Sequence, residues 1–147
     1  MKKEYSYGII PFYKNTKWDI QVLLVQNKWS WHRWFPKWHQ EKWEDPIHTA
    51  IRELYEETWL ETKNIHNKII KEKIYIDHSK EKDEWVLIEK HCWYFIWEVI
   101  SKKVKKQKNE ISNFIRLFID KVENKITYDS SKKVFQKAIQ IILNSVF

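Results

Sequence analysis

The chain contains a single glycine, Gly8, although average usage of about 7% would give roughly ten in 147 residues. Glycine reaches positive φ without steric cost, so tight turns and left-handed helix ends normally depend on it. The same chain has ten tryptophans, and tryptophan takes up that backbone conformation only with strain. The sequence therefore predicts one of two situations: a fold that needs almost no glycine, or a fold in which some tryptophans stand at glycine positions.

Length and composition indicate a globular chain, which we expect to form a single domain over residues 1–147. Apolar residues make up 43% and charged residues 32%, so the chain can bury a core. The only cysteine, Cys92, excludes a disulfide framework and a zinc site built from several cysteines. The N-terminal segment lacks the apolar run of a secretory signal, and no stretch reaches the roughly 18 apolar residues of a membrane span. We therefore expect a cytoplasmic protein with no membrane partner.

The net charge of +7 comes almost entirely from lysine, since the only arginines are Arg33, Arg52 and Arg116. Such an excess is typical of chains that bind nucleic acid or phosphates. The lysines are scattered rather than gathered on one predicted face, and abundant Lys, Asn and Ile are typical of an AT-rich gene. We therefore favour base composition as the cause.

The hydropathy pattern predicts an α/β or α+β fold. Apolar runs predict strands at 5–13, 19–26, 69–76, 85–100 and 112–119, and polar residues predict a hairpin loop at 77–84. Helical periodicity predicts helices at 46–58 and 132–146. Residues 27–43 show no period and are expected to form a loop. Because strands precede each helix, we expect a mixed sheet between helices.

The helix expected at 46–58 has a well-defined start and two different faces. Asp45 is a suitable N-cap, and Pro46 suits the first helical position. One face is apolar and is expected to be buried; it contains Ile47, Ala50, Ile51, Leu54 and Thr58. The opposite face contains one arginine and three carboxylates that we expect to converge on one patch: Arg52, Glu53, Glu56 and Glu57.

This acidic patch is unfavourable for the helix itself. Like charges three or four residues apart destabilise a helix by about 0.2–0.5 kcal/mol per pair, and carboxylates near its C-terminal end oppose the helix dipole. Mg²⁺ prefers clustered carboxylate oxygens, so a bound cation would explain the arrangement. The alternative, from the residues alone, is an acidic face exposed to solvent.

Residues 38–60 resemble the Nudix box, whose pattern is G-x5-E-x7-R-E-U-x-E-E-x-G-U, with U a bulky aliphatic residue. Seven of the nine specified positions match at the required spacing: Glu44, Arg52, Glu53, Leu54, Glu56, Glu57 and Leu60. The two departures are Trp38 and Trp59, and both stand where the family has glycine. The resemblance implies a Nudix-type α/β/α sandwich and a metal-dependent hydrolase that cleaves phosphoanhydride bonds of nucleotides.

Both departures replace glycine by tryptophan, which links the motif to the unusual composition. The codon UGA is read as tryptophan in one variant genetic code and as glycine in some bacterial lineages, so translation under the wrong code would produce this pattern. The clearest cases are Trp38, Trp43 and Trp59; further candidates are Trp34, Trp18, Trp29, Trp31 and Trp97. We expect tryptophan at position 59 to strain the helix end and tryptophan at position 38 to crowd the metal site.

The resemblance also implies roles for residues in and near the box. The implied ligands of Mg²⁺, or of Mn²⁺ in its place, are Glu53, Glu56, Glu57 and the backbone carbonyl of Trp38. The implied general base is one of three carboxylates: Glu53, Glu56 or Glu110. Arg52 would orient the glutamates, and Glu44 would hold the joint between loop and helix.

The loop before the box supplies the expected substrate contacts. Lys37 and His39 are candidate phosphate-binding residues. Three tyrosines either stack on a nucleobase or pack in the core: Tyr75, Tyr94 and Tyr128. The segment Phe35-Pro36-Lys37 and the short length are most similar to the bis(5′-nucleosyl)-tetraphosphatases, which implies a dinucleoside tetraphosphate as the small-molecule substrate.

Two alternatives stay open. Another Nudix substrate, a nucleoside triphosphate or the 5′-triphosphate end of RNA, fits the same box, although Lys37 stands where RNA pyrophosphohydrolases usually have glutamine. The other alternative is a catalytically silent Nudix module that binds nucleotides, and the intact glutamates argue against it. The oligomeric state stays open.

Overall fold

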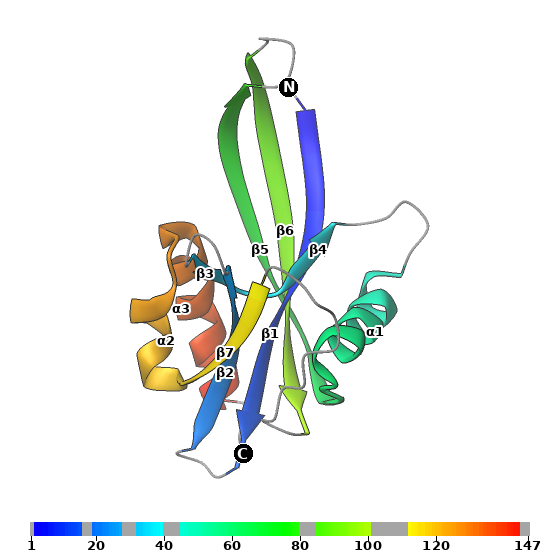
Figure 1. The fold of residues 1–147 in the computed structure, drawn as a ribbon, viewed down its shortest axis with the longest axis vertical. Coiled ribbons are helices and arrows are strands. Elements are labelled where there is room, and N and C mark those ends of the chain that lie inside the picture. The colour runs from blue at the N-terminus through cyan, green and yellow to red at the C-terminus, as the bar shows by residue number, and fades with distance from the viewer. Residues whose placement is uncertain are drawn as a thin grey trace.

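The computed structural model describes residues 2–15, 19–27, 32–39, 45–79, 85–100 and 112–144 (Figure 1). Within these ranges one sheet contains seven strands: β1 (Lys2–Lys14), β2 (Ile20–Asn27), β3 (Arg33–Trp34), β4 (Lys37–His39), β5 (Thr62–Ser79), β6 (Trp85–Val99) and β7 (Ser112–Phe118). The same ranges contain three helices: α1 (Pro46–Thr58), α2 (Ile119–Lys125) and α3 (Asp129–Asn144). No helix in the described part of the chain is both long and apolar enough to cross a membrane.

The sheet is mixed because two of its strands run parallel while their neighbours run antiparallel. The strand order is β3-β2-β1-β6-β5, with β4 paired to β1 and β7 paired to β2. Strands β1 and β6 are parallel, and their register places Glu4 opposite Lys90 and Ser6 opposite Cys92. The other pairs are antiparallel. This register brings Lys90 beside the N-terminal strand β1.

The side chains of the central strands alternate between two cores, one on each face of the sheet. On one face, residues of β1 and β6 pack against α1: Tyr7, Ile9, Phe95 and Trp97 with Ala50 and Leu54. On the other face the same strands pack against α2 and α3: Ile10, Phe12, Tyr94 and Ile96 with Val122, Val134 and Phe135. Figure 1 shows α1 on one side of the sheet and α2 and α3 on the other. The predicted α/β/α sandwich with a mixed sheet is confirmed.

Most of the predicted helices and strands are confirmed. The differences occur in short segments whose secondary structure depends on pairing with distant strands. The helix predicted at 46–58 has the predicted bounds, and the two long strands of the predicted hairpin are β5 and β6. The prediction of loop throughout 27–43 is wrong, because β3 pairs with β2 and β4 pairs with β1. Helix α2 was not predicted, since its seven residues are too few to show a period.

The one glycine is required by close packing rather than by backbone conformation. A Cβ atom added at Gly8 would lie 2.7 Å from two ring carbons of Tyr94 and 3.2 Å from the carbonyl oxygen of Pro36. Among the described residues, the only non-glycine residue with positive φ is Trp59. The left-handed position that glycine normally fills is therefore filled here by a tryptophan.

Cys92 belongs to the core between the sheet and α3, where it is 5% exposed. Burial raises the pKa of the Cys92 thiol, which disfavours the nucleophilic thiolate. This environment is that of a small buried apolar residue and not of a catalytic cysteine.

Candidate functional site

Helix α1 is held against the sheet by its apolar face, which leaves its charged face outward. The Asp45 carboxylate accepts a hydrogen bond from the Ile47 backbone N–H at 3.1 Å, so the helix begins as predicted. Ala50, Leu54 and Thr58 are buried on the inner face. Ile47 was predicted on that face but is 37% exposed and does not belong to the buried cluster that contains Ala50 and Leu54.

The C-terminal end of α1 has the backbone geometry that the motif requires of glycine. Trp59 has φ 63° and ψ 13°, in the left-handed region, and its backbone N–H donates to the Tyr55 carbonyl at 2.8 Å. The Trp59 side chain is 47% exposed. A side chain with a Cβ in this conformation costs about 1–2 kcal/mol. The expected strain at position 59 is confirmed by this geometry.

Replacing Trp59 with glycine is expected to raise the free energy of unfolding by about 1 kcal/mol, since glycine relieves the strain but loses more entropy on folding. Chemical denaturation followed by circular dichroism measures the change. Trp59→Ala is the matched control, because it removes the indole but keeps the Cβ. Equal stabilisation by alanine and glycine would contradict an origin in the backbone angle.

Arg52 pairs with two glutamates of the acidic patch. Its guanidinium donates to both carboxylate oxygens of Glu56, each at 3.1 Å, and to Glu53 at 3.4 Å. This is the pairing expected of an arginine that orients the box glutamates. All three side chains are partly exposed, so the pairs contribute little to stability and fix orientation more than they stabilise the fold.

The third glutamate of the patch contacts a tryptophan of another element. The Trp38 indole Nε1–H donates to Oε1 of Glu57 at 3.1 Å. Trp38 lies on β4, whose pairing with β1 places it opposite Tyr7. Strand β4 thus brings residue 38 beside the C-terminal half of α1, and its indole contacts the carboxylate expected to bind metal. The indole thus engages one oxygen of that carboxylate, and crowding of a metal site by residue 38 stays a prediction.

The chemistry of the donor set suits Mg²⁺, whereas the side-chain arrangement is not a preformed cluster. Glu53, Glu56 and Glu57 offer hard oxygen ligands within about one turn of α1. Among the residues that the structure describes, no group of three His, Cys, Asp or Glu side chains is close enough to hold a metal ion. In this arrangement Arg52 pairs with both Glu53 and Glu56 while Glu57 accepts a hydrogen bond from Trp38, so the predicted convergence of the three carboxylates on one cation stays a prediction.

Several sequence-predicted residues lie outside the described ranges. They are Glu44, Glu110, Trp43, Trp18, Trp29 and Trp31. Their roles stay predictions.

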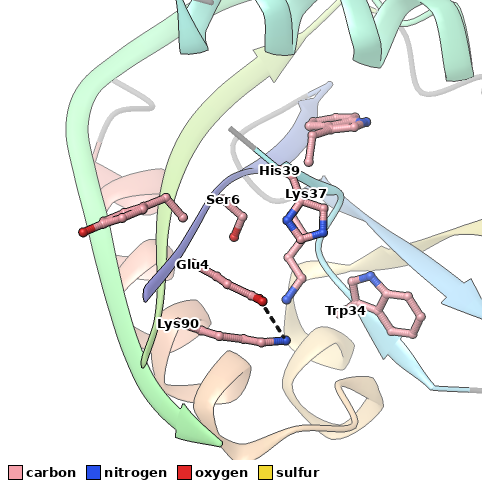
Figure 2. A pocket seen from close by; sticks show the side chains of 8 residues that line it. Glu4, Ser6, Trp34, Lys37, His39 and Lys90 are labelled. Atoms are coloured by element: carbon pink, nitrogen blue, oxygen red, sulfur yellow. Dashed lines mark ion pairs between the residues drawn. The ribbon is translucent and has the colours of Figure 1, made fainter. Parts of the chain in front are cut away.

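The two predicted substrate-binding residues line one cavity together with Trp38. This cavity has a volume of about 240 Å³ and is lined by Glu4, Tyr5, Ser6, Trp34, Lys37, Trp38, His39 and Lys90. Figure 2 shows the ends of Lys37, Lys90 and Glu4 directed toward one another across it. Lys90 pairs with Glu4 at 3.9 Å. Lys37 and His39, the chain neighbours of Trp38, thus line one cavity with the residue whose indole contacts Glu57.

Sequence reasoning missed Glu4, Ser6 and Lys90 as cavity residues. Nothing in their local sequence distinguishes them, because each lies in an ordinary strand pattern. Glu4 and Ser6 reach the cavity because β1 pairs with β4, and Lys90 reaches it through the parallel register of β1 and β6.

A family model and solved structures both resemble this chain over most of its length. The family model described as the NUDIX domain matches residues 2–137. No curated protein matches the sequence. The structure is similar to a Caenorhabditis elegans Ap4A hydrolase in a binary complex, with a TM-score of 0.64 and 18% identity, covering 96% of this chain and 98% of that one. It is also similar to a MutT protein from Bacillus halodurans, with a TM-score of 0.67 and 22% identity, covering 90% and 80%.

Proposed function

This chain belongs to the Nudix family of hydrolases, and we propose that it hydrolyses a phosphoanhydride bond of a dinucleoside tetraphosphate. The observation that carries this proposal is the position of strand β4. Residue 38 of β4 lies beside Glu57 of α1, and its chain neighbours Lys37 and His39 line a cavity together with Lys90. A carboxylate proposed to bind a cation and ammonium groups proposed to bind phosphates are thus carried by neighbouring elements, a combination that suits cleavage of a polyphosphate.

The proposed metal ligands are the three glutamates of α1 with the backbone carbonyl of residue 38. A Mg²⁺ or Mn²⁺ ion held there would supply neutralisation of phosphate charge and a lower pKa for water beside it. The protein supplies a carboxylate to accept the proton of the attacking water, from Glu53, Glu56 or Glu110. Arg52 keeps Glu53 and Glu56 oriented through the hydrogen bonds described above.

Phosphate binding is assigned to Lys37 and His39, with Glu44 holding the joint between loop and helix. Lys37 is exposed on β4 and directed into the cavity, where its ammonium can pair with phosphate oxygens (Figure 2). The single cysteine is consistent with an enzyme of the reducing cytoplasm. Residues 1–147 are taken as one Nudix domain.

The choice of a dinucleoside tetraphosphate is supported by the segment Phe35-Pro36-Lys37 before the box. The fold is similar both to an Ap4A hydrolase and to a MutT protein, so fold alone favours neither substrate class. Nucleoside triphosphates are the second candidate substrates, because the same box fits them.

We also propose that tryptophans 38, 43 and 59 stand for glycines encoded by UGA. Two described positions support this: Trp59 adopts a left-handed backbone, and the Trp38 indole engages a proposed metal ligand. Trp97 differs, because it is fully buried and stacks on Phe95 with ring centroids 6.1 Å apart. The codons of the gene test the idea, since UGG at these three positions would contradict it.

Chromatographic separation of the nucleotide products formed with Mg²⁺ tests the proposed function, because cleavage of diadenosine tetraphosphate by one water yields two mononucleotides and no free phosphate. The substrates are diadenosine tetraphosphate, nucleoside triphosphates and RNA with a 5′-triphosphate, and the chain is assayed with tryptophan and with glycine at positions 38, 43 and 59. We expect the glycine form to cleave diadenosine tetraphosphate with the highest kcat/KM. Faster cleavage of a triphosphate would overturn the substrate class, and no cleavage of any substrate would support a silent nucleotide-binding module.

A further inference from the structure

One face of the sheet continues beyond the core that packs against α1. Side chains alternate between the two faces along a strand, so Trp93 of β6 shares a face with Phe95 and Trp97. Phe95 and Trp97 are buried in that core, whereas Trp93 is 39% exposed. Figure 1 shows the adjoining parts of β1, β5 and β6 extending beyond the helices. The outer face, as we name this region, consists of six exposed side chains: Lys3, Tyr5, Lys71, Lys73, Tyr75 and Trp93.

Three of these side chains are aromatic rings. Tyr5 is 47% exposed and Tyr75 is 56% exposed, so neither ring is needed to fill a core. The register and the strand spacing place the Cα atoms of Tyr5 and Trp93 about 8 Å apart and those of Tyr5 and Tyr75 about 12 Å apart. The Tyr5 ring stacks on the ring of His91, with centroids 5.2 Å apart, which fixes its orientation. The outer face thus offers separate flat surfaces, two of them tyrosines that do not depend on how UGA is read.

The other three side chains of the outer face are lysines. The Lys71 Nζ atom lies 5.5 Å from the centroid of the Trp93 ring, and the Lys73 Nζ atom lies 5.7 Å from that of the Tyr75 ring. The carboxylate beside them is Glu89, which is 5% exposed and pairs with Lys73 at 3.0 Å and with Lys3 at 3.9 Å. Three ammonium groups against one carboxylate leave this set of side chains positive. The lysines look scattered along the sequence, but the register of three strands brings these together.

We propose that the outer face binds single-stranded nucleic acid, with bases stacked on Tyr5, Tyr75 and Trp93 and phosphates paired with the lysines. Exposed rings interleaved with cations suit a chain of flat bases joined by phosphates. A duplex hides the faces of its bases, and an acidic peptide offers charge without flat rings. A second copy of this face would bring lysines against lysines, which is unfavourable.

The outer face adjoins the cavity that contains Lys37, because Tyr5 also lines that cavity. Binding on the outer face is nevertheless a separate property from the proposed function, since it requires neither a metal nor hydrolysis. It is therefore measured with strands that end in a 5′-hydroxyl and contain no phosphoanhydride bond.

Fluorescence anisotropy of the full chain with a labelled oligoadenylate of about twelve nucleotides tests the proposal. We expect this strand to bind at least about tenfold more tightly than an abasic strand of equal length and charge, because stacking contributes about 1–3 kcal/mol per base. A duplex of the same length should also bind more weakly. With three lysines, log K should fall with log salt concentration with a slope of about −2. RNA and DNA forms of the strand identify the natural ligand, and selective binding of either supports the proposal.

Variants of the outer face separate stacking from charge. Tyr75→Ala is expected to lower the affinity for oligoadenylate at least about fivefold, whereas Tyr75→Phe keeps the ring and should retain it. Lys71→Ala should reduce the steepness of the salt dependence by about 0.7. The matched controls are Phe118→Ala and Lys121→Ala, an exposed ring on β7 and an exposed lysine on α2, and both should bind within about twofold of the unchanged chain.

Three results would overturn the proposal. The first is equal affinity for the oligoadenylate and the abasic strand, which would show attraction by charge alone. The second is full affinity in Tyr75→Ala. The third is failure to bind any strand, including the case in which the chain self-associates and Tyr75→Ala abolishes that association, which would assign the outer face to a second copy.

Discussion

Replacing Trp38 with glycine is expected to tighten Mn²⁺ binding about tenfold or more. In the present chain a cation must displace the indole N–H from Glu57 Oε1, a contact of 3.1 Å. A hydrogen bond to a charged group contributes about 1.5–3 kcal/mol, and 1.4 kcal/mol corresponds to a tenfold change in affinity. Calorimetric titration of Mn²⁺ into both chains measures the difference.

Two further variants test the reason for that effect. Trp38→Phe removes the N–H donor but keeps an aromatic ring. Its Mn²⁺ affinity should therefore lie between that of the chain with Trp38 and that of Trp38→Gly. Trp93→Gly is the matched control, because Trp93 is exposed on β6 and does not line the cavity that contains Lys37 and His39. Unchanged affinity in Trp38→Gly, or an equal gain in Trp93→Gly, would contradict competition between the indole and the metal.

Glu57→Gln and Glu53→Gln, each made in the chain with glycine at 38, 43 and 59, are expected to lower kcat by about 10²–10⁴-fold. Removal of a metal ligand or of a general base has effects of this size. The amide keeps the size of the side chain, so folding should be preserved. Hydrolysis of diadenosine tetraphosphate at saturating Mg²⁺ is the measurement.

The matched control for these carboxylates is Glu61→Gln. Glu61 is an exposed glutamate just beyond the C-terminal end of α1, so it shares the local charge without belonging to the box. Its variant should retain the rate within about twofold, because surface substitutions away from a site have small effects. If Glu53→Gln and Glu57→Gln were as active as Glu61→Gln, these carboxylates would have no role in hydrolysis.

Local sequence signals were sufficient for helix α1 and the long strands. Asp45 and Pro46 mark the start of α1, and the structure places both as capping rules predict. The left-handed residue after the helix was also predictable, since the motif requires glycine there and Trp59 has φ 63°. These features depend on residues close together in the chain.

The remaining features of the fold and of the site depend on contacts between residues far apart in the sequence. Strand β4 is three residues long and exists because it pairs with β1, which no local pattern indicates. Lys90 joins Lys37 only through the register of β1 and β6. Helical spacing placed three glutamates on one face, but it could not predict that Arg52 would pair with Glu53 and Glu56 while Trp38 of another element contacts Glu57.

The claim on which the whole account depends is that the carboxylates of α1 bind the divalent cation used in hydrolysis. Anomalous diffraction from Mn²⁺-soaked crystals of the Trp38→Gly chain locates that cation directly. We predict a peak within coordination distance of Glu57 and at least one of Glu53 and Glu56. A peak elsewhere, with these three side chains bound only to Arg52 or solvent, would contradict the account.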